Sequence, residues 1–135
     1  MTTPIVGSPA SSVDLSINQN ASFTLFFTWL VKPVDVLLPG VPINLAGYSA
    51  LLQITDVSNS SKVLFEASTR NGRIKLFGTT GRVEIRFSAE DTEEMKFTEG
   101  LYDLLMKAPN GDVRRPLKGR CIIDRGISKF DSNNS

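Results

Sequence analysis

Apolar and polar residues alternate with a period of two along most of the chain. In residues 82–87, Val83, Ile85 and Phe87 fall on one face and charged residues on the other. Because successive side chains of a β-strand point to opposite faces, this pattern predicts a strand with one buried face. The same alternation predicts strands at residues 13–17, 22–31, 48–54, 63–67, 102–106 and 117–123.

Clusters of turn-forming residues separate these strands, at residues 58–61, 71–72, 78–81 and 109–112. Asn and Gly tolerate the positive φ angles that tight hairpins require. Seven or eight short strands at this spacing predict an all-β sandwich or barrel.

We expect one domain over residues 12–128. Residues 1–11 mix Pro, Gly, Ser and Thr and predict a flexible N-terminal arm, while residues 129–135 predict a polar C-terminal tail. The arm either frays or becomes ordered against a neighbouring subunit.

One segment departs from the alternation. Ser88 precedes an acidic run and is followed three residues later by Asp91, which is the spacing of a capping box. A short helix near residues 89–96 is therefore predicted, with negative charge near its start, where the helix dipole favours it. A cation site is the alternative for this run, but it lacks the ligand spacing of an EF-hand. The acidic residues concerned are Glu90, Asp91, Glu93 and Glu94.

Composition restricts the chemistry further. The 135 residues include no His and a single Cys, which excludes a Ser/His/Asp triad, a Cys/His pair, imidazole metal sites and an intramolecular disulfide. Carboxylate, Lys or Tyr chemistry has no diagnostic spacing here. We therefore predict a non-enzymatic protein without a metal or cofactor.

Charge and hydropathy limit the kinds of partner that the chain could have. Fifteen basic against fourteen acidic residues disfavour a nucleic-acid partner, because such domains usually carry a clear excess of Lys and Arg. The longest apolar run is too short for a membrane-spanning helix. The N-terminus lacks a basic start followed by an apolar stretch, so we expect no signal peptide and folding in a cytoplasm.

Three motifs carry a resemblance to a known family. A strand ending in Trp29 is followed by Pro-Ile-Asn-Leu-Ala-Gly-Tyr-Ser-Ala at 42–50, then by Phe-Ser-Ala-Glu-Asp-Thr at 87–92 and Gly-Leu-Tyr-Asp-Leu at 100–104. Over about residues 13–127 the chain resembles a family of small tailed-phage and prophage virion proteins. Their immunoglobulin-like domain is similar to the N-terminal domain of upper-baseplate proteins.

The resemblance implies an immunoglobulin-like antiparallel β-sandwich of seven or eight strands. It also implies a structural protein of a tailed bacteriophage particle, in a tail, baseplate or fibre-attachment position. Other virion structural proteins would be its partners, several copies would be present, and assembly would take place in the host cytoplasm.

Five residues are assigned structural roles. Gly47 and Tyr48 look like a turn that leads into a strand. Gly100 and Tyr102 are similar to a tyrosine corner, in which the Tyr hydroxyl bonds the nearby backbone; the alternative is that Tyr102 is a core aromatic. Trp29 is expected in the core rather than as a platform for a ligand.

The chain departs from the family between Trp29 and Pro42, where an apolar segment replaces a short polar hairpin. Monomers rarely leave large contiguous apolar patches exposed, so something should cover this segment. Either it folds back over an open end of the sandwich, or it packs into a neighbouring subunit, which is our hypothesis. The side chains expected in this contact are Val34, Val36, Leu37, Leu38 and Val41.

Other candidate contact residues lie on predicted strands. Phe26 and Leu30 occupy the face opposite the core side chains of their strand, either as interface anchors or beneath the apolar segment. Arg114, Lys118 and Arg120 share one parity of the last strand, which indicates either a solvated face or an electrostatic contact.

The favoured function is a non-enzymatic building block of a phage particle. A capsid or neck decoration protein is the nearest alternative. From another class, a host-surface carbohydrate-binding domain or adhesin would require exposed aromatic residues, whereas Trp29 and both Tyr residues fall at predicted core or turn positions.

Overall fold

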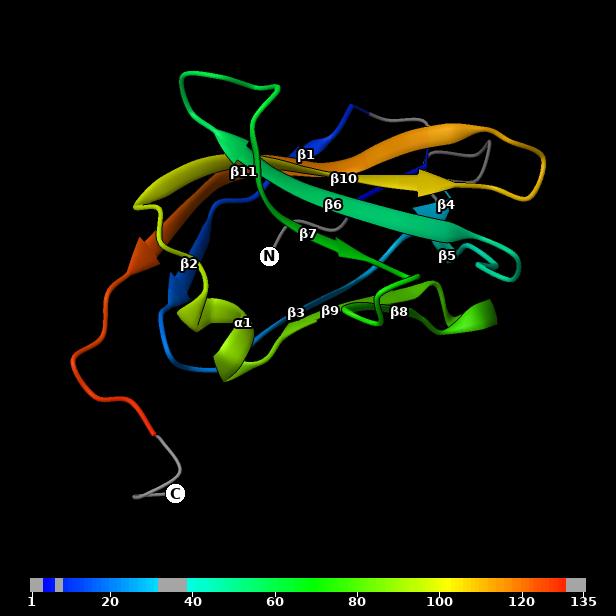
Figure 1. The fold of residues 1–135 in the computed structure, drawn as a ribbon. Helices are drawn as coiled ribbons and strands as arrows, with labels where there is room; N and C mark the ends of the chain where they lie inside the picture. The colour runs from blue at the N-terminus through cyan, green and yellow to red at the C-terminus, as the bar shows by residue number, and fades with distance from the viewer. Residues whose placement is uncertain (1–3, 7–8, 32–38, 131–135) are drawn as a thin grey trace.

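The chain folds into two facing β-sheets, as a computed structural model of residues 4–6, 9–31 and 39–130 describes it (Figure 1). The larger sheet contains β1 (Ser11–Ser12), β2 (Leu15–Asn18), β6 (Ser49–Asp56), β7 (Val63–Ser68), β10 (Glu99–Lys107) and β11 (Val113–Asp124). The smaller sheet contains β3 (Phe23–Thr28), β8 (Ile74–Leu76) and β9 (Arg82–Phe87). The predicted all-β sandwich is confirmed.

The larger sheet runs in the order β1, β11, β10, β6, β7, with β2 also beside β11, and the smaller sheet runs β3, β9, β8. All pairs within these two sheets are antiparallel except those of β1 and β2 with β11, which are parallel. This arrangement is compatible with an immunoglobulin-like sandwich. The parallel pairing of the first and last strands departs from the purely antiparallel sheets that the sequence predicts.

Each predicted strand is present, with two refinements. The strand expected over residues 22–31 is interrupted at Trp29, whose amide donates to the Gly81 carbonyl while its own carbonyl accepts from Ile43. After this change of partner the chain forms β4 (Leu30–Val31), which pairs with β5 (Val41–Pro42). The three-residue strand β8 was not predicted from the sequence, because it lies between two turn clusters.

The core lies between the sheets and follows the alternation of the strands. Val83, Ile85 and Phe87 are fully buried, as their common face predicts. Trp29 is buried too, and Tyr48 meets its ring edge-on with centroids 6.1 Å apart. The expectation that Trp29 belongs to the core is confirmed.

The helix α1 (Ala89–Glu93) and the 3-10 turn η1 (Gly78–Thr80) flank β9 in sequence. The capping box is present: the Ser88 hydroxyl accepts from the Asp91 amide, and the Asp91 carboxylate accepts from the Ser88 amide. The helix ends at Glu93, shorter than the predicted 89–96, and Met95 beyond it is buried in the core.

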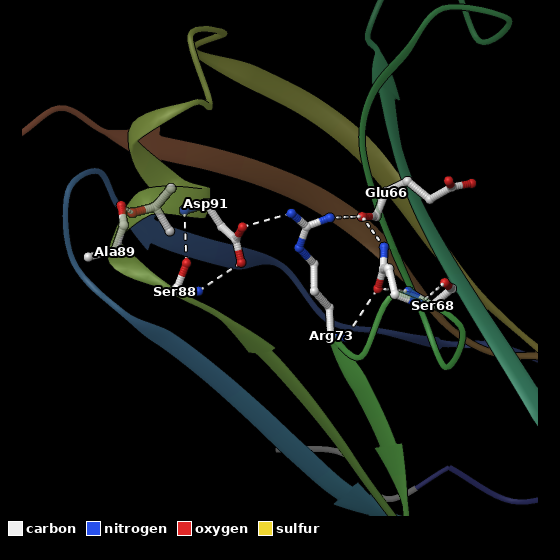
Figure 2. Close-up of polar contacts among 8 residues, drawn as sticks. Glu66, Ser68, Arg73, Ser88, Ala89 and Asp91 are labelled. Carbon is white, nitrogen blue, oxygen red and sulfur yellow. Dashed lines mark hydrogen bonds and ion pairs between the residues drawn. The ribbon is translucent and has the colours of Figure 1, made fainter.

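Arg73 connects this helix to the other sheet (Figure 2). Its guanidinium donates to the Asp91 carboxylate at 2.7 Å and to the Glu66 backbone carbonyl at 3.0 Å. The guanidinium also lies 4.6 Å from the centre of the Phe65 ring. These contacts hold α1 against the connection between β7 and β8, so the acidic start of the helix has a structural role.

Parts of the predicted N-terminal arm pair with the sandwich. Val6 donates to the Leu30 carbonyl, and the Leu30 amide donates to the Pro4 carbonyl. Ser11 lies in β1, opposite Leu117. At the other end, Lys129 of the predicted tail forms an ion pair with Glu93.

Candidate functional site

Of the five side chains predicted to form the apolar contact, the described part of the structure includes one. Val34, Val36, Leu37 and Leu38 lie outside the described residues. Val41 lies in β5 and is 55% exposed. The exposure of Val41 agrees with a residue available to a partner.

Phe26 and Leu30 have different surroundings. Phe26 projects from the outer face of the smaller sheet and is 50% exposed. Leu30 is half-buried, and a Cβ atom at Gly40 would lie 3.0 Å from the Leu30 Cβ. Leu30 therefore packs against its own chain, and Phe26 is the more accessible of the two.

Phe26 belongs to an aromatic and basic cluster that the sequence did not reveal. The Arg82 guanidinium lies 4.1 Å from the centre of the Phe26 ring and 6.0 Å from the centre of the Phe77 ring. Phe26 stands opposite Glu84 in the β3–β9 ladder, which makes Arg82 its diagonal neighbour, and the Phe77 amide donates to the Arg82 carbonyl on the other side. Cation–π contacts of this kind hold an arginine in a defined orientation.

Charged side chains extend this cluster over the same outer face. Lys75 stands opposite Glu84 in the β8–β9 ladder, and Arg86 stands opposite Thr24 in the β3–β9 ladder. We call this surface the basic aromatic face; its residues are Phe26, Lys75, Phe77, Arg82, Glu84 and Arg86. Three cations and one carboxylate leave it with an excess of positive charge.

The prediction that Arg114, Lys118 and Arg120 share one face of the last strand is wrong for Arg114. The β10–β11 register shifts by one residue, so that Leu104 faces Leu117 but Met106 faces Arg114. An extra residue in one strand reverses the alternation beyond it. Arg114 therefore lies on the same face as the buried Met106, whereas Lys118 and Arg120 lie on the outer face.

Pro116 sits at this irregularity and is buried. A proline inside a strand cannot donate to the ladder and is usually found at bulges or edges. The proline between Arg114 and Lys118 was thus the signal that could have revealed the change of face.

Ion pairs occupy part of the outer face of the larger sheet. Arg115 pairs with Asp103 at 2.8 Å, and Arg120 pairs with Glu99. Lys118 has no ion pair among the described residues. A shallow hollow of about 690 Å³ lies over this face between β6, β10, β11 and β1. With most of its charges already paired, this face presents less free charge than the basic aromatic face.

Arg114 lines a smaller hollow of about 340 Å³ with Trp29 and Ile5, and Arg115 and Lys118 border this hollow as well. The buried Trp29 Nε1 has no hydrogen-bond partner within the described ranges. The basic side chain and the indole donor both favour electronegative groups.

Tyr102 is buried, but it does not form the predicted tyrosine corner. Its hydroxyl donates to the Val13 carbonyl at 2.5 Å, 89 residues away, rather than to nearby backbone. Burial raises the pKa of the Tyr102 phenol, so it stays protonated and remains a donor. Tyr102 thus serves as a core aromatic with a long-range hydrogen bond.

The two predicted structural glycines are sterically required. Gly47 has a φ of +78°, and a Cβ there would lie 2.7 Å from Pro109 Cγ, in agreement with the predicted turn before β6. A Cβ at Gly100 would lie 2.6 Å from Ile54 Cγ2 and 2.9 Å from the Thr55 carbonyl oxygen. Side chains at either position would displace their neighbours.

Cys121 is fully buried, on the same face of β11 as Leu117 and Ile123. Burial raises the pKa of its thiol to about 12, which keeps it protonated at neutral pH. Within the described ranges, no three Asp, Glu or Cys side chains gather closely enough to hold a metal ion. None of the helices in the described part of the chain is long and apolar enough to span a membrane.

No family model and no curated protein matches this chain.

Proposed function

We propose that this chain is a non-enzymatic structural subunit of a tailed bacteriophage particle, in a tail, baseplate or fibre-attachment position. The proposal combines the motif resemblance with one structural observation. Phe26 and Val41, two apolar side chains expected to contact neighbours, are both at least half exposed. Large apolar side chains on the surface are typical anchors of protein interfaces.

Such a subunit acts by assembly. Contacts that are individually weak fix a subunit firmly when many copies repeat them, because each bound neighbour raises the effective concentration of the next contact. The exposed cations Arg114 and Lys118, which have no ion pair among the described residues, supply further contacts to acidic neighbours and help to set their orientation, whereas Arg120 is engaged by Glu99.

Purified particles test this function. The chain is produced with the rest of the particle genes, and the particles are separated from free protein on a density gradient and analysed by quantitative mass spectrometry. We expect the wild-type chain in the particle fraction at a fixed ratio to the other subunits. Absence from this fraction, or binding of the free chain to host polysaccharide, would overturn the proposal.

A pair of matched variants links the result to the surface. Phe26→Ser with Val41→Ser should lower incorporation by about tenfold or more, as loss of interface anchors does. Val57→Ser serves as the control, because Val57 is 49% exposed but lies in the turn after β6, outside the predicted contact. Equal incorporation of both variants would contradict the assigned surface.

A further inference from the structure

Arg82 is the centre of the basic aromatic face. Phe26 and Phe77 flank its guanidinium, and its side chain keeps 43% of its surface exposed. Glu84 approaches it only to 3.9 Å, which is longer than a hydrogen bond. Arg82 is thus held in position while its donors remain available, and a positioned guanidinium favours bidentate binding of a carboxylate.

The neighbouring cations are available as well. Lys75 and Arg86 are exposed, and neither has an ion pair with any described residue. Arg73, by contrast, is occupied by Asp91. A ligand of this face should therefore carry several negative charges.

The same chain carries an acidic surface of that kind on α1 and its C-cap residue, Glu94. Glu90 and Glu94 are exposed and have no ion pair within the described part of the chain. They are four residues apart, so they lie on neighbouring turns. The other two acids of the run are engaged, Asp91 by Arg73 and Glu93 by Lys129.

Arg82, the centre of the basic aromatic face, and α1 lie at opposite ends of β9, and the face continues along the strand to Arg86. Phe77 and Arg82 lie at its start, beside η1, and α1 follows its end (Figure 1). Six strand residues span about 20 Å, so Glu90 and Glu94 lie far from Arg82 of their own chain.

We propose that the basic aromatic face of one copy binds helix α1 of a second copy, with Glu90 and Glu94 facing Arg82 and Lys75. The two patches differ, so the contact is head-to-tail and repeats from copy to copy. A head-to-tail contact generates a closed ring or a filament. This inference deepens the proposed function, on which it rests for the place where such a ring would be used.

The chemistry of the contact predicts its behaviour. Contact with a second copy would exclude water around the guanidinium between the two phenyl rings and strengthen its pairing with a carboxylate. The outer charges remain near solvent, so added salt should weaken them. Association should therefore depend on both protein concentration and ionic strength.

Sedimentation of the purified chain tests the proposal. We expect wild type to form oligomers that grow with concentration at low salt and dissociate at high salt. Two double variants each remove one side of the contact. Lys75→Gln with Arg82→Gln disables the basic aromatic face, and Glu90→Gln with Glu94→Gln disables the acidic surface of the helix. Each double variant alone should be monomeric. Lys107→Gln, at the exposed end of β10 in the other sheet, is the control and should associate like wild type.

Mixing the two disabled variants gives the decisive result. One retains its helix and the other retains its face, so a single junction can form and the mixture should stop at a dimer. Any of three results would overturn the inference. The wild-type chain could stay monomeric at millimolar concentration and low salt, the disabled variants could associate like wild type, or the mixture could contain no dimers. Monomeric wild-type chain that is still incorporated into particles would overturn this inference and leave the proposed function standing.

Discussion

The Tyr102 hydroxyl donates a hydrogen bond to the Val13 carbonyl across an intervening strand. Tyr102 lies in β10, and its partner in the neighbouring β11 is Gly119, which has no side chain. Val13 lies between β1 and β2, on the far side of β11. The absence of a side chain at Gly119 allows the phenol to reach over the strand, so one hydrogen bond joins β10 to the segment between β1 and β2.

Replacing Tyr102 with Phe tests the value of this bond. The ring stays in the core, while the Val13 carbonyl loses the partner that the structure gives it. A partly buried hydrogen bond of this kind contributes about 0.5–1.5 kcal/mol, and the Tyr102→Phe chain should lose about that much in the free energy of unfolding. Urea denaturation measures the difference; an unchanged midpoint would show that the hydroxyl contributes nothing.

Gly119→Ala tests the close approach beneath the phenol. A Cβ at this position would overlap the Val13 carbonyl oxygen, which is backbone and cannot rotate away. We expect a loss of about 1–3 kcal/mol in the free energy of unfolding from this crowding. Gly111→Ala is the comparison, because Gly111 has open space around it and its cost comes from its positive φ alone. If Gly119→Ala left the urea midpoint unchanged, the described packing would be wrong.

Asp91 should make stability depend on pH in acid. Its hydrogen bond with the Arg73 guanidinium holds the pKa of the Asp91 carboxyl below its ordinary value of 3.8, assisted by the Ser88 amide. A lowered folded-state pKa means that the stabilisation is complete well above pH 3.8 and is lost as the pH falls through the folded-state value. Asp91→Asn should therefore be less stable than wild type at neutral pH and should lose less on acidification.

Thermal denaturation between neutral and acidic pH measures this effect. The melting temperatures of wild type and Asp91→Asn should converge as the pH falls, because the side chain at this position is then neutral in both chains. Melting temperatures that fell in parallel would contradict the role given to the Arg73 pair. Asp112→Asn, at an exposed turn without an ion pair in the described ranges, is the matched control.

Cys121 should be unreactive in the folded chain. Burial raises the pKa of its thiol to about 12, and the thiolate is the reactive form. We expect no reaction with a disulfide reagent at mildly alkaline pH under native conditions and one equivalent after unfolding in denaturant. Rapid native labelling would mean that β11 opens or that the thiol is accessible.

Period-two alternation predicts most of the strands of this fold, because the core lies between two sheets. In β9 the alternating apolar residues have almost no exposed surface, and the predicted bounds 82–87 match the strand. The capping box was equally local, since Ser88 and Asp91 are three residues apart. Features decided by neighbouring residues were thus accessible without a structure.

The missed features depend on contacts between distant residues. Arg114 was placed on the wrong face because the register shift requires knowledge of both β10 and β11. Arg82 was not singled out, since its position between Phe26 and Phe77 arises only when three strands pair. The partner of the Tyr102 hydroxyl was 89 residues away, beyond any local motif.

A density map of the purified particle tests the central claim most directly. The account predicts density that fits this two-sheet sandwich at a symmetric, multi-copy position in the tail, baseplate or fibre attachment, with Phe26 and Val41 turned toward neighbouring subunits. A complete map in which every such position is filled by other chains, from particles made while this chain is expressed, would contradict it.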